Sequence, residues 1–474
     1  MIIASYLVVS TCYSVGFSGI QRLAFPTLNT SNTTNTMFVL LTLTISICFV
    51  DFDHSYSFSQ GSFVCNFYTS FFQFVLLCST LCFLYVSKEF VGVKKIVNFE
   101  YELIISFSIL GLALINICDD FLTLYLAVEL QSLCFYVLAT FNKSSEYCAE
   151  AGVKYFVLGA FSSGLLLFGF TLFYASFGTI SFESIERVNS LFHCLMAFIG
   201  CLFFSTAVLF KLGSFPFHMW LCDVYDGSMI NITAFFSTIP KVILLSFFIK
   251  VLFIVFSGNM EEFNFLLVTS GLGSICFASV AALYQKRIKR LMAYSTVSHT
   301  GFLVLGIFCS SVDSIKACTV YIILYILMTL TLFCLLFLSG INNAQQKYLI
   351  NWTSLYERNF SVALAFALLL LSVAGIPPLA GFYSKLCILL CLLSKNHVLV
   401  TVVIAIFSSI ACFYYIRLIK ILFFTSNSKT QFWFGNGTKN VESFISLSLT
   451  IIILFLIRPN LLLDSSIITA ISLT

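Results

Sequence analysis

Four charged side chains lie deep inside long apolar stretches of the sequence. They are Glu129, Lys211, Lys241 and Lys385. An ionisable group at the centre of a membrane costs about 2.5–3.5 kcal/mol on insertion scales, so such groups persist where they are paired, hydrated or functional. A desolvated lysine can exchange its proton near neutral pH, whereas an arginine keeps its proton. The set therefore predicts proton transfer, with the single deep carboxylate, Glu129, tuning a lysine; a plain ion pair between Glu129 and Lys211 is the structural alternative.

Four further residues have weaker or divided interpretations. His299 lies in mid-run among serines and threonines, which suits either a neutral-pH proton relay or a hydrogen-bonded structural histidine. Lys154 follows Glu150 by four residues, the spacing of an ion pair on a helix surface. We expect His218 to be structural or to lie at the mouth of a water path. We expect Lys250, near the end of its run, to extend its ammonium to the outer interface.

Prolines and glycines interrupt two apolar runs close to these lysines. Proline removes an intrahelical hydrogen bond, and a broken helix is tolerated at membrane depth where it lines a polar cavity. Lys211 comes five residues before Pro216, and Lys385 comes seven residues after Pro378. A break frees backbone polar groups and admits water, which a proton-carrying lysine needs. The predicted helix breaks lie at Gly213, Pro216, Gly375, Pro377 and Pro378.

The sequence has none of the common motifs for nucleotides, metals or nucleophilic catalysis. It contains no Walker A loop, strand-linked GxGxxG fingerprint, HExxH pair or nucleophile elbow. The 18 cysteines lie mostly in apolar runs, and no CxxC pair has a second pair to complete a metal site. We therefore predict no metal site and no cofactor-binding residues in this chain.

The composition shows what must position these residues. The 474 residues are 60% hydrophobic and 9% charged, with a mean hydropathy of +1.03, which is typical of a membrane protein. Long continuous apolar runs predict helices, because barrel strands would alternate over about ten residues. The predicted fold is an all-α polytopic transmembrane bundle of about 14 spans, near residues 2–20, 37–52, 63–86, 99–117, 120–140, 150–177, 193–220, 233–256, 264–284, 291–310, 315–339, 360–393, 398–424 and 443–463.

Charge placement orients these spans. With the N-terminus outside, most basic residues between spans fall on the inner connections, as the positive-inside rule requires. The net charge of +4 is thus a matter of topology and indicates no nucleic-acid partner. The opening MIIASYLVVS lacks the features of a signal or transit peptide, so we expect a chain made in a bacterium or inside an organelle. The abundance of phenylalanine weakly favours an organelle.

The two interrupted spans are five apart in order, which predicts two five-span halves with the second inverted. The expected organisation is three leading spans over residues 1–95, a first half over 96–256, a second half over 257–425, and a loop with a final span over 426–474.

Six segments in fixed order resemble subunit 2 of NADH dehydrogenase, the antiporter-like membrane subunit of respiratory complex I that bacteria call subunit N. The resemblance covers about residues 99 to 425. The segments are ELQSLCFYVLATF (129–141), EAGVKYFVLGAFSSGLLLFG (150–169), FKLGSFPFHMW (210–220), QKRIKRLMAYSTVSHTGF (285–302), AGIPPLAGFYSK (374–385) and FYYIRLIK (413–420).

The resemblance implies a proton-pumping module of NADH:ubiquinone oxidoreductase. Glu129, Lys211, Lys241 and Lys385 match the family's buried glutamate and lysines, and His299 matches a histidine of its connecting path. NADH, FMN, iron–sulfur clusters and ubiquinone are then expected in other subunits. The expected partners are membrane-arm subunits and lipids, so the chain would not act as a stand-alone monomer. The expected location is the mitochondrial inner membrane, or a bacterial plasma membrane.

Two alternatives and one departure accompany this resemblance. An Mrp-type cation/proton antiporter subunit and a structural spacer of the membrane arm are the other candidates, and a plastid or hydrogenase-type relative of the same superfamily also remains open. The segment DVYDGSMINITAF (223–235) lacks the prolines of the family pattern. We therefore expect a softened loop over residues 223–234.

Overall fold

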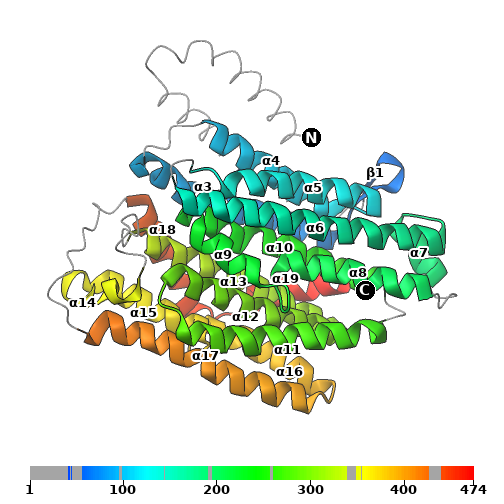
Figure 1. Ribbon diagram of the computed structural model, residues 1–474. Coiled ribbons are helices and arrows are strands. Elements are labelled where there is room, and N and C mark those ends of the chain that lie inside the picture. Colours follow the sequence, from blue (N-terminus) through cyan, green and yellow to red (C-terminus); the bar gives the residue numbers. More distant parts are fainter. Residues whose placement is uncertain are drawn as a thin grey trace, which may run out of the picture.

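The computed structural model describes residues 41–42, 44, 56–94, 99–142, 145–189, 195–256, 260–338, 348–353, 355–425 and 439–473. The span predicted near residues 2–20 and nearly all of that near 37–52 lie outside the described residues. The region from residue 67 onward is built of helices (Figure 1).

The long helices follow the apolar runs of the sequence. Within the described residues, ten are long and apolar enough to cross a membrane, and four shorter apolar helices accompany them. The helices are α3 Phe67–Lys94, α4 Phe99–Ile117, α5 Phe121–Ala139, α6 Glu146–Phe177, α7 Phe182–Asn189, α8 Leu195–Leu212, α9 Met219–Gly227, α10 Ile230–Ile254, α11 Met260–Tyr284, α12 Ile288–Phe308, α13 Val312–Leu338, α14 Leu355–Arg358, α15 Phe360–Ala374, α16 Ala380–Ser394, α17 Val398–Phe424, α18 Lys439–Leu454 and α19 Asn460–Ile471.

Three helices form the core of this bundle. Helices α10, α12 and α13 are almost wholly buried, and they contact one another. Helices α4, α5 and α6 lie along one side of the bundle and α11, α16 and α17 along the opposite side (Figure 1). Most of the apolar surface of α6 and α17 faces outward, as expected where lipid or another subunit replaces water.

Two spans are interrupted at the predicted glycines and prolines. Helix α8 ends at Leu212 and α9 begins at Met219, with Gly213 between them at φ +72°. Helix α15 ends at Ala374 and α16 begins at Ala380, and Gly375 has φ +83°. A glycine in the left-handed region ends a helix without a steric penalty, and the prolines that follow cannot continue it.

The end of the chain differs from the prediction of one final span over 443–463. Helix α18 ends at Leu454, and α19 begins at Asn460, directly after Pro459. Proline has no backbone N–H and fits the start of a helix better than its interior, so it separates the two helices. Helix α19 then packs on α13 and α3.

A β-hairpin and a short helix are among the elements that were not predicted. Strands β1 (Tyr56–Phe58) and β2 (Phe63–Cys65) form an antiparallel hairpin whose register pairs Tyr56 with Cys65. The hairpin is followed directly by α3, and Phe63 also bridges to Cys118, at the connection between α4 and α5. The other element is the amphipathic helix α7, between the long helices α6 and α8.

Candidate functional site

Lys211 and Lys241 line one internal cavity. The cavity has a volume of about 30 Å³, about twice the minimum that holds a water molecule. Helices α5, α6, α8, α9 and α10 contribute its walls. Its other polar lining residues are Gln131, Ser132, Tyr136, Tyr155, Ser162, Trp220 and Tyr225. The structure therefore brings together two predicted lysines in a polar pocket within an apolar bundle.

Lys241 is the more deeply buried of these two lysines. Its side chain is 3% exposed, and its Nζ atom has no hydrogen-bond partner in the described part of the chain. The ammonium lies 5.8 Å from the centre of the Tyr325 ring. Pro240, directly before it, removes one backbone bond within α10. The Lys241 ammonium is therefore buried beside an aromatic face and a cavity large enough for water.

Lys211 lies in the last turn of α8, and its side chain lines the cavity. Other groups donate hydrogen bonds to the carbonyls at the end of this helix. The Ser214 N–H and hydroxyl donate to the Leu209 carbonyl at 3.1 and 3.0 Å. The Trp220 indole N–H, from α9, donates to the Phe210 carbonyl at 3.1 Å. These donors cap the end of α8.

Glu129 lies close enough to Lys211 for electrostatic attraction but does not form a contact ion pair with it. In the part of the chain that the structure describes, which includes both residues, no carboxylate comes within 4.0 Å of the Lys211 ammonium. Glu129 is half-buried and accepts a hydrogen bond from the Ser132 hydroxyl at 3.3 Å. The structural alternative of a locked Glu129–Lys211 pair is therefore absent from this conformation.

Lys385 uses the second helix break differently. Its ammonium donates to the carbonyls of Val373 at 3.0 Å and Ala374 at 2.7 Å. These are the last carbonyls of α15, which lose their helical partners because the helix stops at Gly375. The negative end of the α15 dipole thus faces the ammonium. Lys385 takes the position at this break that the Trp220 indole takes at the first.

His299 is buried on α12, between these two groups of residues. Its Nδ1 atom shares a 2.7 Å hydrogen bond with the Tyr321 hydroxyl. It lies within electrostatic range of both Lys241 and Lys385. The ring of Tyr325 is its other aromatic neighbour, with centroids 5.6 Å apart. His299 therefore lies near both lysines, and the hydrogen bond to Tyr321 that a structural histidine would form is present.

Tyr321 and Tyr325 are site residues that the sequence analysis missed. They lie four apart on α13 in the stretch YIILY and therefore face the same side. The sequence contained a signal for them, because a buried tyrosine needs a hydrogen-bond partner for its hydroxyl. Two tyrosines on one face of an apolar span therefore indicate polar contacts along that face.

His218 is not among the residues that line the cavity of Lys211 and Lys241. It is 2% exposed, and neither ring nitrogen has a hydrogen-bond partner in the described residues. Its ring packs 4.4 Å from that of Phe277 on α11 and stacks on Phe215. The surroundings fit the structural interpretation of this residue.

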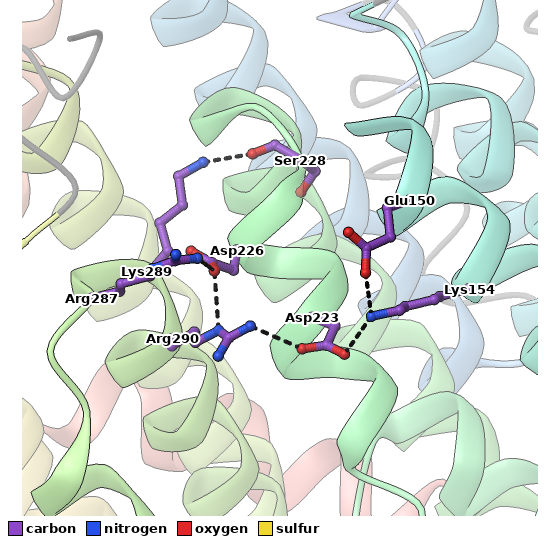
Figure 2. Close-up of polar contacts among 8 residues, drawn as sticks. All are labelled: Glu150, Lys154, Asp223, Asp226, Ser228, Arg287, Lys289 and Arg290. Carbon is purple, nitrogen blue, oxygen red and sulfur yellow. Dashed lines mark hydrogen bonds and ion pairs between the residues drawn. The ribbon is translucent and has the colours of Figure 1, made fainter. Parts of the chain in front are cut away.

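Lys154 belongs to a group of charges at the predicted inner end of the bundle (Figure 2). The predicted pair with Glu150 is present at 2.7 Å, and Lys154 also contacts Asp223 on α9 at 3.1 Å. Arg290, from α12, contacts the other oxygen of Asp223 at 3.2 Å. We call this group the inner charge cluster; its members are Glu150, Lys154, Asp223, Asp226, Arg287, Lys289 and Arg290.

The inner charge cluster holds the segment for which a soft loop was predicted. Helix α9 runs to Gly227 and α10 begins at Ile230. Asp226 is shared by Arg287 and Arg290, and the Lys289 ammonium donates to the Ser228 carbonyl. The hydrogen bond that Arg287 donates to Asp226 raises the pKa of Arg287 above its usual range, so this guanidinium stays charged. The expected loop over residues 223–234 is therefore corrected: the segment is helical except at Ser228 and Met229, and ion pairs of Asp223 and Asp226 hold it against α6 and α12.

Lys250 reaches the predicted outer end of the bundle, but in a buried ion pair and not in water. Its ammonium donates to the Cys118 carbonyl at 2.9 Å and lies 3.3 Å from Asp119. The two side chains are 3% and 10% exposed. The prediction of an interfacial ammonium is thus corrected: the connection between α4 and α5 covers it.

Asp119→Asn is expected to destabilise the protein by about 3–5 kcal/mol, because it leaves the buried Lys250 charge without its partner. The measurement is the thermal unfolding temperature of the purified assembly. Asp120→Asn is the matched control, since Asp120 is half-exposed and forms no ion pair in the described residues. Equal unfolding temperatures for the two variants would contradict a stabilising role for the pair.

Comparison with known proteins finds a family that matches this chain. The family described as "NADH:quinone oxidoreductase/Mrp antiporter, TM" matches residues 118–412. The chain is 33% identical over 400 residues to NADH-ubiquinone oxidoreductase chain 2 of Marchantia polymorpha, covering 83% of this chain and 81% of that one. It is 33% identical over 414 residues to NADH-quinone oxidoreductase subunit N of Pelagibacter ubique, covering 87% of both.

Solved structures share the fold at lower identity. A chain of respiratory complex I from Thermus thermophilus superposes with a TM-score of 0.82 at 23% identity, over 98% of each chain. A chain of the Mrp complex from Dietzia sp. superposes with a TM-score of 0.85 at 16% identity, over 99% of this chain and 97% of that one. The fold is therefore shared with chains of respiratory complex I and of an Mrp complex.

Proposed function

Because this chain belongs to the NADH:quinone oxidoreductase/Mrp antiporter transmembrane family, we propose that it is a proton-translocating membrane subunit of an NADH:quinone oxidoreductase. The observation that carries this proposal is the polar cavity shared by Lys211 and Lys241 inside an apolar bundle. The relatives named as chain 2 and subunit N cover most of this chain, whereas the likeness to the Mrp complex is one of fold.

The proposed path begins at the predicted inner side. A proton loads Lys211 or Lys241 through the cavity, whose size and polar walls suit water. The charge of Glu129 tunes Lys211 from beyond contact distance, so that moving or neutralising it releases the proton. His299 passes the proton across the middle, and Lys385 holds it against the carbonyls of α15 before release outside.

The arrangement of the helices supports two halves over residues 96–256 and 257–425. The first contains α4, α5, α6, the broken pair α8 and α9, and α10. The second contains α11, α12, α13, the broken pair α15 and α16, and α17. The fourth span is thus interrupted in each half, at a left-handed glycine. An odd number of spans per half would invert the second across the membrane.

We assign NADH, FMN, iron–sulfur clusters and ubiquinone to other subunits, because the buried ionisable set of this chain suits the transfer of protons. Other membrane-arm subunits and lipids would cover the exposed apolar faces of α6 and α17. The relatives include NADH-ubiquinone oxidoreductase chain 2 of a plant and subunit N of a bacterium, which fits the mitochondrial inner membrane or, as the alternative, a bacterial plasma membrane.

Glu129→Gln is expected to slow NADH-driven proton pumping by about three- to tenfold, the effect of losing about 1 kcal/mol of charge coupling to Lys211. The measurement is proton uptake by vesicles that contain the assembled complex. Glu146→Gln is the control, since Glu146 is an exposed acid at the inner end of α6.

Two outcomes would favour the other candidates. Unchanged pumping in Glu129→Gln, at normal assembly and with intact electron transfer, would favour a structural spacer. Pumping that stops when sodium is replaced by choline would favour an Mrp-type cation/proton exchange.

A further inference from the structure

The ring of Tyr325 is a neighbour of both Lys241 and His299. The Lys241 ammonium lies 5.8 Å from its centre, and the His299 ring centre lies 5.6 Å from it. The three residues come from three buried helices, α10, α12 and α13, which pack together. In the described residues no hydrogen bond joins Lys241 to His299. The ring of Tyr325 therefore adjoins both of the groups between which the proposed path moves a proton.

The Tyr325 hydroxyl is fixed to the helix that carries the lysine. It donates to the Ser237 carbonyl at 2.8 Å, one turn before Lys241 and beside Pro240. The side chain is 2% exposed, so water does not compete for this bond from the surface. With its hydroxyl committed as a donor, the residue presents an aromatic ring to the lysine, and a ring neither gives nor accepts a proton.

His299 is fixed in a similar way. Its Nδ1 atom shares a 2.7 Å hydrogen bond with the Tyr321 hydroxyl. In the tautomer in which Nδ1–H donates this bond, Nε2 is the nitrogen that can take up a proton. Tyr321 and Tyr325 lie one turn apart on α13, so this helix fixes both the acceptor and the ring beside it. The transfer itself would move one proton from the Lys241 ammonium to the His299 imidazole, leaving a neutral amine and an imidazolium.

We propose that Tyr325 is a positioning residue that separates Lys241 from His299 and lets a proton cross only when its hydroxyl leaves the Ser237 carbonyl. This inference rests on the proposed proton-pumping function. A pump needs such a separation, because a continuous path between the two sides would let protons flow back. Tyr325 would block proton transfer between Lys241 and His299 until its hydroxyl releases the Ser237 carbonyl of α10.

Tyr68 provides a matched control within the same structure. Its hydroxyl donates to the Ser246 carbonyl of α10, also at 2.8 Å. It is equally buried, at 2% exposure. Tyr68→Phe therefore removes the same kind of bond to the same helix, at a turn that carries neither Lys241 nor a neighbour of His299.

The experiment compares Tyr325→Phe, Tyr68→Phe and the unaltered complex in sealed vesicles. After NADH is exhausted, the pH gradient is expected to decay about fivefold faster in Tyr325→Phe, the population shift that follows the loss of one ordinary hydrogen bond. Protons pumped per NADH should fall while NADH oxidation continues. Tyr68→Phe should behave like the unaltered complex in both measurements.

Two results would overturn the inference. Equal gradient decay in the two variants would reduce the Tyr325 bond to ordinary packing. A joint fall of pumping and NADH oxidation in Tyr325→Phe, without leakage, would make its hydroxyl a carrier on the path in place of a barrier.

A parallel measurement on Lys211→Met separates this inference from the proposed function. If Lys211→Met loses pumping while the pH gradient decays equally fast in the two tyrosine variants, the proposed pumping function stands and the barrier role of Tyr325 is rejected. Normal pumping in Lys211→Met would reject that lysine as a carrier and leave Lys241 as the loading site, so the two tyrosine variants would still decide the barrier.

Discussion

Lys241→Met is expected to lower NADH-driven proton pumping by the assembled complex by about a hundredfold or more, the lower end of the range for removing a proton-transfer group. The same change should leave the unfolding temperature unchanged or raised. The Lys241 ammonium is buried without a hydrogen-bond partner among the described residues, and a methionine of similar length removes the cost of burying it. Loss of pumping without loss of stability would indicate that Lys241 is needed for proton transfer and not for folding.

Lys250→Met is the matched control, because Lys250 is a buried lysine nine residues further along the same helix. Its removal leaves the Asp119 carboxylate unpaired, so it should lower the unfolding temperature. Pumping by those complexes that assemble should remain near normal. Vesicle pumping and thermal unfolding, measured on both variants, form the test. A Lys241→Met complex that is less stable but pumps normally would make Lys241 a structural residue.

Gly375→Ala is the second change with a large expected effect, because it acts on both the helix break and Lys385. Gly375 has φ +83°, where an alanine costs about 1–2 kcal/mol. A Cβ atom there would lie 2.9 Å from Cδ and 3.2 Å from Nζ of Lys385. The Lys385 side chain must shift to relieve this contact, and we expect the shift to disturb its hydrogen bonds to the carbonyls of Val373 and Ala374. We expect pumping to fall as far as in Lys385→Met.

Gly178→Ala separates the backbone cost from the displacement of the lysine. Gly178 ends α6 at φ +70°, and nothing lies within 4 Å of the position that its Cβ would take. The two alanine variants should therefore lose similar stability, while only Gly375→Ala loses pumping. Normal pumping in Gly375→Ala, at full assembly, would show that the contact between Lys385 and the end of α15 is not needed.

The two helix breaks show how similar local signals lead to different sites. Each break has a left-handed glycine followed by proline, and each frees carbonyls at the end of a helix. At the first break the Trp220 indole takes a freed carbonyl, and Lys211 faces a cavity. At the second break Lys385 itself takes the carbonyls. The first lysine is therefore placed to exchange with water, and the second to be held.

Several features of this protein were determined by the sequence itself. The membrane class and the helices from residue 67 to 424 follow from uninterrupted apolar runs of sufficient length. The two central breaks follow from glycine and proline, whose backbone restrictions act on their own turn. The deep charges could be found because a charge in an apolar run is costly wherever the helix lies. The break at Pro459 was equally local and could have been predicted.

The tertiary structure alone decided which of these residues meet. Lys241 and Tyr325, Lys250 and Asp119, and the members of the inner charge cluster are joined across distant segments. A run of apolar residues predicts that a helix is buried. It does not predict which helix packs against each face, because the hydrophobic effect is non-directional. The partner that decides whether a buried lysine is paired, capped or left to water is therefore set by helix packing, which the local sequence does not contain.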